Sequence, residues 1–375
     1  MLLFVDQSGQ LGGAELCLAD IAASFGDQAH VLLMADGPFS GFLRQRGVGV
    51  RVISLPRSAA RLTKKASPAD LASSFPALAG HALALRREFR KYDALYLNTA
   101  KALLYGVAAS AGLRKPRVFH LHDLWDQDHF SPPNIRMLVA AANRTRAVIA
   151  NSQATADTFH SAGGRAPCHV IPNGFDPTPF DRVSAEKITA LRRQFNPEGH
   201  PVAAIFGRLS RWKGQDVLIR AALRIPHLTV WIVGDAFFTD DDRAYAEELK
   251  VLAAPAGARI RFLGFREDVP ALMRSADLIV HASTAAEPFG RVLVEGMLAG
   301  KPVIASDAGG PREIVEHGVT GLLVPPGNAP ALAEALASPV WCEKMGRAGR
   351  ARAEGRFGLP AVLAQTREVL APFLP

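Results

Sequence analysis

Two glutamates in the last third of the chain are spaced so that their carboxylates could hold one ligand between them. Glu287 and Glu295 flank a stretch that should begin a helix at Phe289 or Gly290. Glu295 would then lie about five residues into the helix, roughly 7 to 8 Å along an axis that rises ~1.5 Å per residue. Carboxylates accept strong hydrogen bonds from hydroxyl pairs, and the N–H groups of a helix start attract phosphate. Hydroxyls at both ends with a diphosphate between them are the groups of a sugar nucleotide.

The segments around this pair place it at the ligand-binding edge of a parallel sheet. Residues 276–281 form a short apolar run, as expected of a strand whose two faces are covered by helices. The loop with Glu287 therefore leaves the carboxyl end of a strand, where open α/β sheets bind ligands. Two glutamates taken alone are more often solvated charges. The preceding strand and the glycines around the helix start favour a binding site here.

The segment 287–290, Glu-Pro-Phe-Gly, followed by Glu295, resembles the E-x7-E signature of the retaining family 4 glycosyltransferases, and residues 300–305 and 318–324 continue the pattern of that family. The resemblance implies an α/β protein of the GT-B fold, with two Rossmann-like doubly wound parallel-sheet domains facing a deep cleft. It implies that Glu287 holds the transferred sugar and Glu295 the ribose. The donor-binding set implied at this helix start is Glu287, Phe289, Gly290, Arg291, Val292 and Glu295.

A pair of cations follows another predicted strand, at 201–207. Arg208 and Lys213 could neutralise a leaving diphosphate, Arg by its planar fork and Lys as a point charge. An ordinary basic surface loop is the alternative. The spacing matches the Arg and Lys pair of family 4, which implies that both residues are catalytic and bind the donor. The resemblance also implies that the loop with Gly264, Phe265 and Arg266 lies against the nucleotide base.

A glycine-rich turn follows the predicted first strand, residues 1–6, and precedes a predicted helix at 16–25. Such a turn is an anion site by its geometry, although the dinucleotide fingerprint G-x-G-x-x-G is absent. A tight crossover without a ligand is the alternative. The turn resembles the glycine loop at the start of family 4 enzymes, which implies that Gly12 and Gly13 face the donor phosphate and that Glu15 faces the acceptor.

Two histidines, His120 and His122, end a predicted strand at 117–121 and should share one face of it. Hydrogen-bonded histidines are the common case at a strand end, and a metal site would need a third ligand that no nearby spacing supplies. By the resemblance, His122 lines the active site near the transferred sugar and is catalytic. Glu15, His120, His122 and Asp126 form the candidate acceptor-binding set.

The length of 375 residues exceeds the size at which one hydrophobic core keeps growing. Apolar runs alternate with helical stretches, which predicts parallel sheets covered on both sides. The segment at 171–176 contains Pro, Asn and Gly and indicates a domain boundary. We expect a Rossmann-like acceptor-binding domain at 1–174 and a Rossmann-like donor-binding domain at 175–357. By the resemblance, a helix at 358–375 packs back on the first domain.

Composition and charge give the expectations for location and partners. No apolar run reaches the ~20 residues of a membrane-spanning helix, and the first residues lack the features of a signal peptide. Three scattered cysteines are typical of reduced thiols, so we expect a cytoplasmic protein. The net charge is +8. Basic clusters at 57–65 and 86–91 could contact an anionic membrane surface, although such clusters more often form a solvated face. We expect no nucleic-acid partner.

Two polar segments receive more ordinary interpretations. The basic loop at 58–67 is predicted to be mobile. The acidic run at 240–242 contains D-x-D, but its position after a polar loop predicts the charged start of a helix, not a metal site.

The function expected from the residues and the resemblance is retaining glycosyl transfer. The sugar would pass from a UDP- or GDP-sugar to a hydroxyl of a glycan, a lipid-linked acceptor or a small molecule. The resemblance implies front-face substitution, in which the leaving diphosphate accepts the proton of the acceptor and no metal or other cofactor takes part. A phosphorylase or a nucleotide-sugar epimerase on the same fold is one alternative. A non-catalytic protein that binds polyanions is the other.

Overall fold

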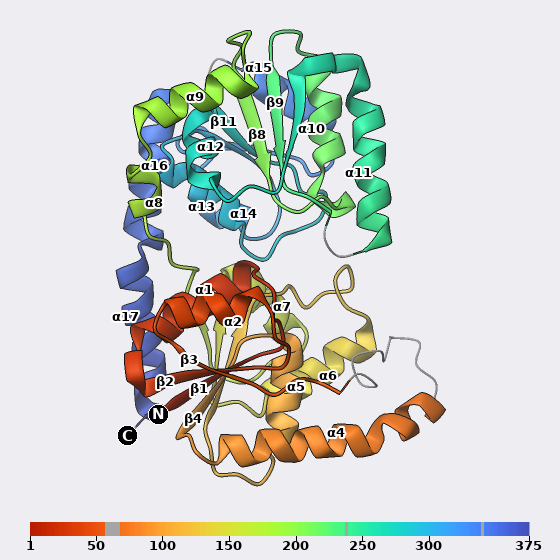
Figure 1. Ribbon diagram of the computed structural model, residues 1–375, viewed down its shortest axis with the longest axis vertical. Helices are drawn as coiled ribbons and strands as arrows, with labels where there is room; N and C mark the ends of the chain where they lie inside the picture. The colour runs from red at the N-terminus through yellow and green to blue at the C-terminus, as the bar shows by residue number, and fades with distance from the viewer. Residues whose placement is uncertain (57–67, 237–238, 339–340, 375) are drawn as a thin grey trace. The chain divides into compact units, whose positions relative to one another are not determined.

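The computed structural model describes residues 1–56, 68–236, 239–338 and 341–374, which form two compact units. The first unit comprises Met1–Gly174 and Pro360–Pro375, and the second comprises Phe175–Leu359. Each unit is a parallel sheet with helices on both faces (Figure 1). The loop predicted to be mobile, 58–67, and the basic cluster at 57–65 lie outside the described residues.

The first unit has seven strands in the order β3-β2-β1-β4-β5-β6-β7. The strands are β1 (Leu2–Asp6), β2 (Ala29–Leu33), β3 (Gly49–Val52), β4 (Ala94–Leu97), β5 (Arg117–Leu121), β6 (Ala147–Ala150) and β7 (Cys168–Val170). One face packs against α1 (Gly13–Ser24), α2 (Pro38–Gln45) and α17 (Leu359–Leu370). The other face packs against α4 (Pro68–Phe89), α5 (Ala100–Ala109), α6 (Pro132–Ala142) and α7 (Gln153–Ser161).

The second unit has six strands in the order β10-β9-β8-β11-β12-β13. The strands are β8 (Val202–Phe206), β9 (Thr229–Val233), β10 (Ile260–Gly264), β11 (Leu278–His281), β12 (Val303–Ser306) and β13 (Gly321–Val324). One face packs against α10 (Gln215–Ala222), α11 (Asp240–Ala253) and α15 (Ala329–Ala337). The other packs against α8 (Thr178–Asp181), α9 (Ala185–Phe195), α12 (Val269–Ser275), α13 (Arg291–Leu298), α14 (Pro311–Ile314) and α16 (Glu343–Phe357). Within the described ranges, the 3-10 helices are Gly26–Gln28, Arg211–Lys213, Ala254–Arg259 and Ala371–Phe373.

Alternation along the central strands explains why these sequences form sheets buried on both sides. Val202, Ala204 and Phe206 of β8 face one hydrophobic core of the second unit, and Ala203 and Ile205 face the other. Successive side chains of a strand point to opposite faces, so a strand covered on both sides must be apolar throughout. Burial on both faces therefore explains the uninterrupted apolar runs in the sequence.

Both sheets reverse their winding once, between β1 and β4 in the first unit and between β8 and β11 in the second. This strand order and the parallel pairing are those of a Rossmann-like doubly wound sheet, so the predicted fold class is confirmed. The carboxyl ends of the strands at such a reversal form the usual ligand-binding edge. The candidate site residues should therefore lie there in each unit.

The C-terminal helix α17 packs on the first unit, although it follows the second unit in sequence. Val362 and Leu370 are buried in the same core as Leu18 of α1. The Arg367 guanidinium donates to the carbonyl of Ser24 at the end of α1. The last helix thus completes the core of the first unit.

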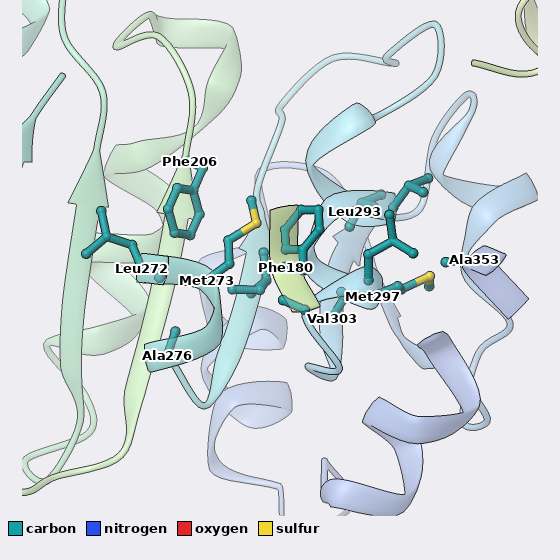
Figure 2. Packing of buried hydrophobic residues seen from close by; sticks show 14 of the residues in the cluster. Phe180, Phe206, Leu272, Met273, Ala276, Leu293, Met297, Val303 and Ala353 are labelled. Atoms are coloured by element: carbon teal, nitrogen blue, oxygen red, sulfur yellow. The ribbon is translucent and has the colours of Figure 1, made fainter. Parts of the chain in front are cut away.

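Helix α13, which carries Glu295, is fixed by its apolar face. Leu293 and Met297 point into a core that also contains Met273 of α12 and Val303 of β12 (Figure 2). Residues four apart lie on the same side of a helix, so these two side chains anchor it over two turns. Its polar positions are held at the ligand-binding edge as a result.

Candidate functional site

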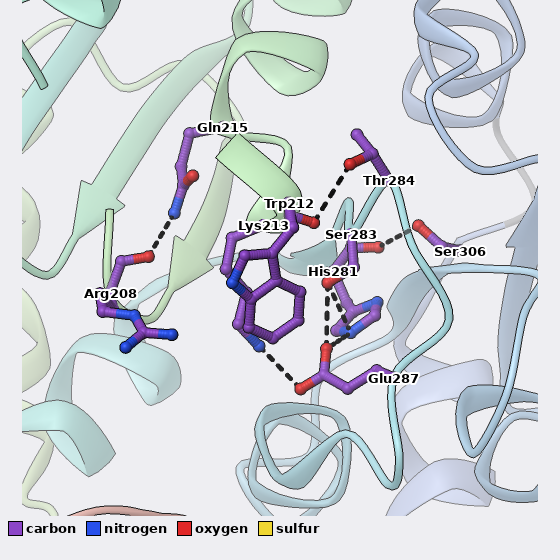
Figure 3. A network of polar contacts seen from close by, with 9 residues as sticks. All are labelled: Arg208, Trp212, Lys213, Gln215, His281, Ser283, Thr284, Glu287 and Ser306. Carbon is purple, nitrogen blue, oxygen red and sulfur yellow. Dashed lines mark hydrogen bonds and ion pairs between the residues drawn. The ribbon is translucent and has the colours of Figure 1, made fainter. Parts of the chain in front are cut away.

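Glu287 lies in the loop after β11 and is held by three polar side chains (Figure 3). Lys213 Nζ donates to Oε1 of Glu287 at 2.7 Å, and Ser283 Oγ donates to Oε2 at 3.0 Å. His281 Nε2 contacts the same Oε2. The side chains of Glu287 and Lys213 are 13% and 19% exposed. The carboxylate is therefore fixed in place, largely away from water, with a cation beside it.

Close backbone contacts between two loops bring Lys213 to this carboxylate. Gly214 follows the 3-10 turn that ends at Lys213, and its φ is 68°. A Cβ at Gly214 would lie 2.0 Å from the carbonyl oxygen of Ala282, so glycine is required by both its conformation and the available space. The backbone N–H of Thr284 donates to the carbonyl of Trp212 at 2.8 Å. Lys213 Nζ also lies 4.1 Å from the centroid of the Trp212 ring.

The electrostatics of this cluster keep Glu287 ionised. Burial by itself would raise the pKa of Glu287. The charges of Lys213 and His281 and their hydrogen bonds outweigh burial and hold the pKa of Glu287 well below its usual range. A carboxylate that stays charged can accept hydrogen bonds from the hydroxyls of a ligand at any pH near neutrality.

Helix α13 starts between the two glutamates, close to the predicted start at Phe289 or Gly290. The helix begins at Arg291, directly after Gly290, whose φ is 105°. Glu295 lies one turn into the helix, with its Oε1 3.6 Å from Arg291 Nη2. The guanidinium of Arg291 covers the Phe175 ring, 4.4 Å from its centroid. One carboxylate and the N–H groups of a helix start are thus held close together, as a diphosphate and a ribose require.

Two residues of the predicted donor set are turned into the protein. The Phe289 ring stacks on Phe175 with ring centroids 6.2 Å apart and is 5% exposed. Val292 packs against the same core. The Phe289 ring is therefore closed to a ligand, whereas the Val292 side chain is only partly buried.

The glycine loop after β12 supports the Glu287 loop. Gly310 N donates to the carbonyl of Glu287 at 2.8 Å. Gly309 has φ 65°, and a Cβ there would lie 2.4 Å from the same carbonyl oxygen. The loop therefore passes so close to Glu287 that no larger residue fits, and it fixes the backbone of the site.

Arg208 follows β8, at the carboxyl end of a strand next to β11. Its backbone carbonyl accepts a hydrogen bond from Gln215 Nε2 at 2.9 Å. Figure 3 shows its guanidinium apart from the ion pair between Lys213 and Glu287. The charged ends of the two cations thus lie apart from each other, which suits the several oxygens of a diphosphate.

The loop proposed to contact the base follows β10. Gly264 ends the strand, and Phe265 is 63% exposed, so its ring is accessible to a stacking ligand. The guanidinium of Arg266 instead forms two hydrogen bonds of 2.8 Å with the carboxylate of Asp268. Arg266 is thus held at the start of α12, while Phe265 is exposed.

In the first unit, three polar side chains end three neighbouring strands. Asp6 ends β1, Asn98 follows β4 and His122 follows β5. Asn98 Nδ2 donates to Asp6 Oδ2 at 2.6 Å, and Asn98 Oδ1 lies 3.0 Å from His122 Nε2. Asp6 and Asn98 are fully buried. His122 is therefore held by a hydrogen-bonded chain at the reversal point of the sheet.

The other histidine and the predicted acidic residue of this loop have different roles in the fold. His120 is buried, with Nδ1 2.6 Å from the Tyr96 hydroxyl, and its ring lies 3.9 Å from that of His122. Burial lowers the pKa of His120 well below its usual value, so the ring is neutral. Asp126 Oδ1 lies 2.6 Å from His129 Nδ1 and accepts two backbone N–H bonds. Asp126 thus organises its own loop, and His120 supports His122.

The glycine turn begins α1, with Gly12 before the helix and Gly13 as its first residue. The carboxylate of Glu15 lies over the turn. A Cβ added at Gly12 would lie 2.6 Å from Glu15 Oε2. Burial, with the charges of Asp6 and Asp123, raises the pKa of Glu15 to about 7. Burial also raises the pKa of Asp6 to about 6, despite the hydrogen bonds that it accepts. This end of the sheet is therefore acidic and poor in water.

We expect Glu15→Gln to stabilise the protein at alkaline pH. The folded-state pKa of Glu15, about 7 against its usual value of 4.5, means that the folded state binds this proton more tightly. The free energy of unfolding therefore falls by up to about 3 kcal/mol between about pH 4.5 and pH 7, and it stays at the lower value above pH 7. Urea unfolding should show Glu15→Gln more stable than the parent at pH 8 and equal to it at pH 4.

The matched control is Glu267→Gln, which makes the same chemical change at an exposed position. It should not alter the dependence of stability on pH. Equal stability of Glu15→Gln and the parent at pH 8 would show that the ionised Glu15 carboxylate is not disfavoured in the fold.

The acidic run at 240–242 occupies the first turn of α11, whose N-terminus is capped by Thr239, as predicted. Asp240 and Asp241 form ion pairs with Arg243 and Arg211. Over the described ranges, the structure has no group of three or more His, Cys, Asp or Glu side chains arranged to hold a metal.

Four polar residues of these clusters were not among the predicted site residues. His281 and Ser283 hold Glu287, and Asp6 and Asn98 hold His122. Asp6 and His281 are the last residues of apolar strands, and Asn98 follows one directly. A polar residue that closes an apolar strand was the available signal, because parallel strands bring such residues together at one edge.

Comparison with known proteins covers both units. Residues 187–354 match the family model of glycosyl transferases group 1, and residues 12–178 match that of glycosyltransferase family 4. A GDP-mannose-dependent alpha-mannosyltransferase of Mycobacterium tuberculosis is 34% identical over 52% of this chain and 47% of its own length. A lipopolysaccharide core biosynthesis glycosyltransferase, LpsE of Rhizobium meliloti, is 30% identical over 51% of this chain and 53% of its own. The match spans about half the length of such curated relatives.

A solved structure extends the similarity to the whole chain. Anabaena Alr3699/HepE, in complex with UDP and glucose, is 42% identical over 99% of both chains, with a TM-score of 0.87. The same protein in complex with UDP-glucose gives 41% identity and the same TM-score. With both units matched by family models, the strand order of the two sheets and this full-length similarity, the chain belongs to the family 4 glycosyltransferases of the GT-B fold.

Proposed function

We propose that the protein is a retaining glycosyltransferase that moves a hexose from a nucleotide-diphosphate sugar to a hydroxyl group. The observation that carries the proposal is Glu287, an ionised carboxylate held by Lys213, His281 and Ser283 at the carboxyl end of β11. These three donors use three of the roughly four lone-pair sites of the carboxylate. The remaining capacity suits one hydroxyl of the transferred sugar.

We favour a UDP-sugar over a GDP-sugar as the donor. The Anabaena protein in complex with UDP-glucose is 41% identical over 99% of the chain. Two mannosyltransferases named as GDP-mannose-dependent are 34% identical over 52% of the chain and 29% identical over 74% of it. Glu295 would accept the ribose hydroxyls, the start of α13 would hold the diphosphate, and the exposed Phe265 ring would contact the base.

The proposed reaction is substitution on the front face of the sugar. The bond between the anomeric carbon and the diphosphate oxygen breaks, and the acceptor oxygen bonds to that carbon on the same face. The acceptor proton passes to the departing diphosphate, so the configuration is retained. Arg208, Lys213 and the start of α13 would stabilise the charge that develops on the diphosphate, which is the task that a metal performs in other enzymes. We propose that no metal or other cofactor is needed.

We propose that the first unit binds the acceptor, a glycan, a lipid-linked sugar or a small polyol. Glu15 and His122, with the buried Asp6 behind them, could accept hydrogen bonds from its hydroxyls. His122 is assigned to contact the reacting sugar.

We propose a cytoplasmic location, with an electrostatic contact to anionic membrane surfaces as a further hypothesis. No helix within the described ranges is long and apolar enough to cross a membrane. In the basic cluster at 86–91, Arg86 donates to backbone carbonyls of Ala109 and Ala111, and Lys91 pairs with Glu88. The membrane hypothesis therefore depends on the exposed Arg87 and Arg90 and on the cluster at 57–65.

The test is the rise in melting temperature when nucleotides bind. A ligand at 100 times its Kd stabilises the folded state by about 2.7 kcal/mol, which is about 5 to 10 °C for a domain of this size. We expect this shift with UDP and UDP-sugars and a smaller one with GDP. Glu295→Gln should reduce the shift with both UDP and UDP-sugars, whereas Glu287→Gln should reduce only the extra shift that the sugar provides.

Product analysis separates the alternatives. Transfer to an added acceptor without inorganic phosphate supports the proposal. Activity that requires phosphate would indicate a phosphorylase, and conversion of the donor without an acceptor would indicate an epimerase. No shift with any nucleotide, in folded protein, would overturn the proposed donor site.

A further inference from the structure

The hydrogen-bonded chain behind His122 crosses three adjacent strands. Asp6 belongs to β1, Asn98 follows β4, and His122 follows β5, and these strands lie in this order in the sheet. Asn98 therefore lies between a buried carboxylate and a partly exposed imidazole, at the point where the sheet reverses its winding. Its own backbone N–H donates to the carbonyl of Val5 at 3.0 Å, which fixes its main chain.

The partners of Asn98 determine which way its amide points. Nδ2 donates to Asp6 Oδ2 at 2.6 Å and to the carbonyl of Ala14 at 3.2 Å. The carbonyl oxygen can only accept a hydrogen bond, and the same holds for the ionised carboxylate. An inverted amide would therefore place its own oxygen against two acceptors. Asp6 is itself held, because the backbone N–H of Ser8 donates to its Oδ1 at 2.8 Å. The amide oxygen of Asn98 must therefore face His122.

This orientation assigns the hydrogen of the imidazole. Asn98 Oδ1 is an acceptor and lies 3.0 Å from His122 Nε2, so Nε2 must carry the hydrogen that joins them. In the neutral ring the other nitrogen, Nδ1, then has the lone pair. We propose that Asn98, backed by Asp6, is a positioning residue that keeps the hydrogen of His122 on Nε2 and the lone pair of the neutral ring on Nδ1.

The consequence for the reaction rests on the function proposed above. Without Asn98, His122 can rotate and can exchange its tautomer, so that the wrong nitrogen meets the substrate. The cost should appear in kcat and not in the affinity for the nucleotide, because UDP binding is assigned to residues of the second unit. Asn98 itself is fully buried and does not need to touch the substrate.

The direct test is ¹⁵N nuclear magnetic resonance of histidine-labelled protein, which distinguishes a protonated ring nitrogen from one with a lone pair. The His122 signals are identified by their loss in His122→Gln. We expect hydrogen on Nε2 in the parent protein and a mixture of tautomers in Asn98→Leu. In Asn98→Asp, the oxygen that replaces Nδ2 faces Asp6 Oδ2 and the Ala14 carbonyl, so it should carry a proton. The other oxygen still accepts from His122, and the hydrogen should stay on Nε2.

Two controls separate positioning from general damage. Thr99→Ala removes the cap of α5 at the next residue, where Thr99 Oγ1 accepts from Ala102 N at 3.4 Å, and should leave the His122 signals unchanged. If Asn98→Leu does not fold, the parent protein and Asn98→Asp still decide the matter. Hydrogen on Nδ1 of His122 in the parent protein or in Asn98→Asp would overturn the inference.

Activity completes the test. Asn98→Leu should lower kcat by about 10- to 100-fold, the loss typical when the outer partner of a functional histidine is removed. Its UDP-induced rise in melting temperature should equal that of the parent. If the parent protein binds no nucleotide, the proposed function is contradicted. The tautomer of His122 is still decided by the nuclear magnetic resonance experiment. An unchanged kcat in folded Asn98→Leu would show that Asn98 does not position His122 for the reaction.

Discussion

Glu287→Gln should lower the rate of glycosyl transfer by about 10²- to 10³-fold, the loss seen when one preorganised polar group of an active site is removed. Gln has nearly the shape of Glu, but its amide accepts at only one oxygen and carries no charge. Lys213, 2.7 Å from Oε1, would lose its counter-charge, and His281 and Ser283 would compete for the remaining acceptor. The measurement is kcat and KM for the nucleotide sugar, with transfer to the acceptor as the readout.

The same substitution should also cost stability, which must be separated from chemistry. Lys213 is 19% exposed, so a buried cation without its partner should lower the free energy of unfolding by about 2 to 3 kcal/mol. The double variant Glu287→Gln, Lys213→Met removes both charges and should recover much of this stability. Its activity should remain as low as that of the single variant. A double variant that recovers activity together with stability would show that the pair serves folding only.

The acid limb of the stability curve gives an independent check on Glu287. The pKa of Glu287 is lowered in the folded state from its usual value of 4.5. Glu287 therefore contributes stability that is fully present above about pH 4.5 and is lost as pH falls toward the folded-state pKa. In Glu287→Gln this part of the acid dependence should be absent. Equal losses of stability between pH 5 and pH 3 in variant and parent would contradict the lowered pKa of Glu287.

Much of the fold could be predicted because its strands are short, apolar and buried on both sides. The strand at 117–121 has the predicted limits, and those predicted at 1–6, 201–207 and 276–281 are one or two residues shorter in the structure. Strand β3 ends at Val52, although the apolar residues continue to Leu55. Ile53 and Leu55 still form backbone hydrogen bonds to Leu33 and Met34 and pack against the core. A sequence pattern reports burial, and burial continues past the last paired residue of the strand.

The candidate site was only partly predictable, because spacing along the chain does not specify side-chain direction. Glu287 and Lys213 were predicted from separate loops, and the structure joins them in one ion pair. Phe289 was assigned to the donor, but its ring packs on Phe175. Arg266 was assigned to the base, but its guanidinium is held by Asp268. These contacts depend on loop conformation, which a strand and helix pattern does not define.

The supporting residues follow a rule that applies to both units. Asp6 and His281 are buried polar residues that end an apolar strand, and each contacts a polar residue from a neighbouring segment. Burying such a group without a partner is costly, so its presence at a strand end already implies a network. The identity of the partner cannot be read from the sequence, because it comes from another strand or loop.

Arg208→Ala should lower kcat by about 10²- to 10³-fold, because the guanidinium would no longer stabilise the charge on the departing diphosphate. The effect on the UDP-induced rise in melting temperature should be smaller, since the developing charge is greatest in the transition state. Arg208→Lys should restore only part of the rate, because an ammonium lacks the planar fork that meets two oxygens at once. Steady-state kinetics and melting curves on the same samples provide both quantities.

Arg211, three residues further along the same loop, is the matched control for Arg208. Its guanidinium is half exposed and forms hydrogen bonds of 2.8 and 2.7 Å with Glu248, so it is already committed to α11. Arg211→Ala removes the same charge from the same segment and should leave kcat unchanged, with a stability loss of no more than about 1 kcal/mol. If both variants lose activity equally, the loop acts through its net positive charge. If Arg208→Ala keeps the parent rate, Lys213 and the start of α13 must stabilise the diphosphate without Arg208.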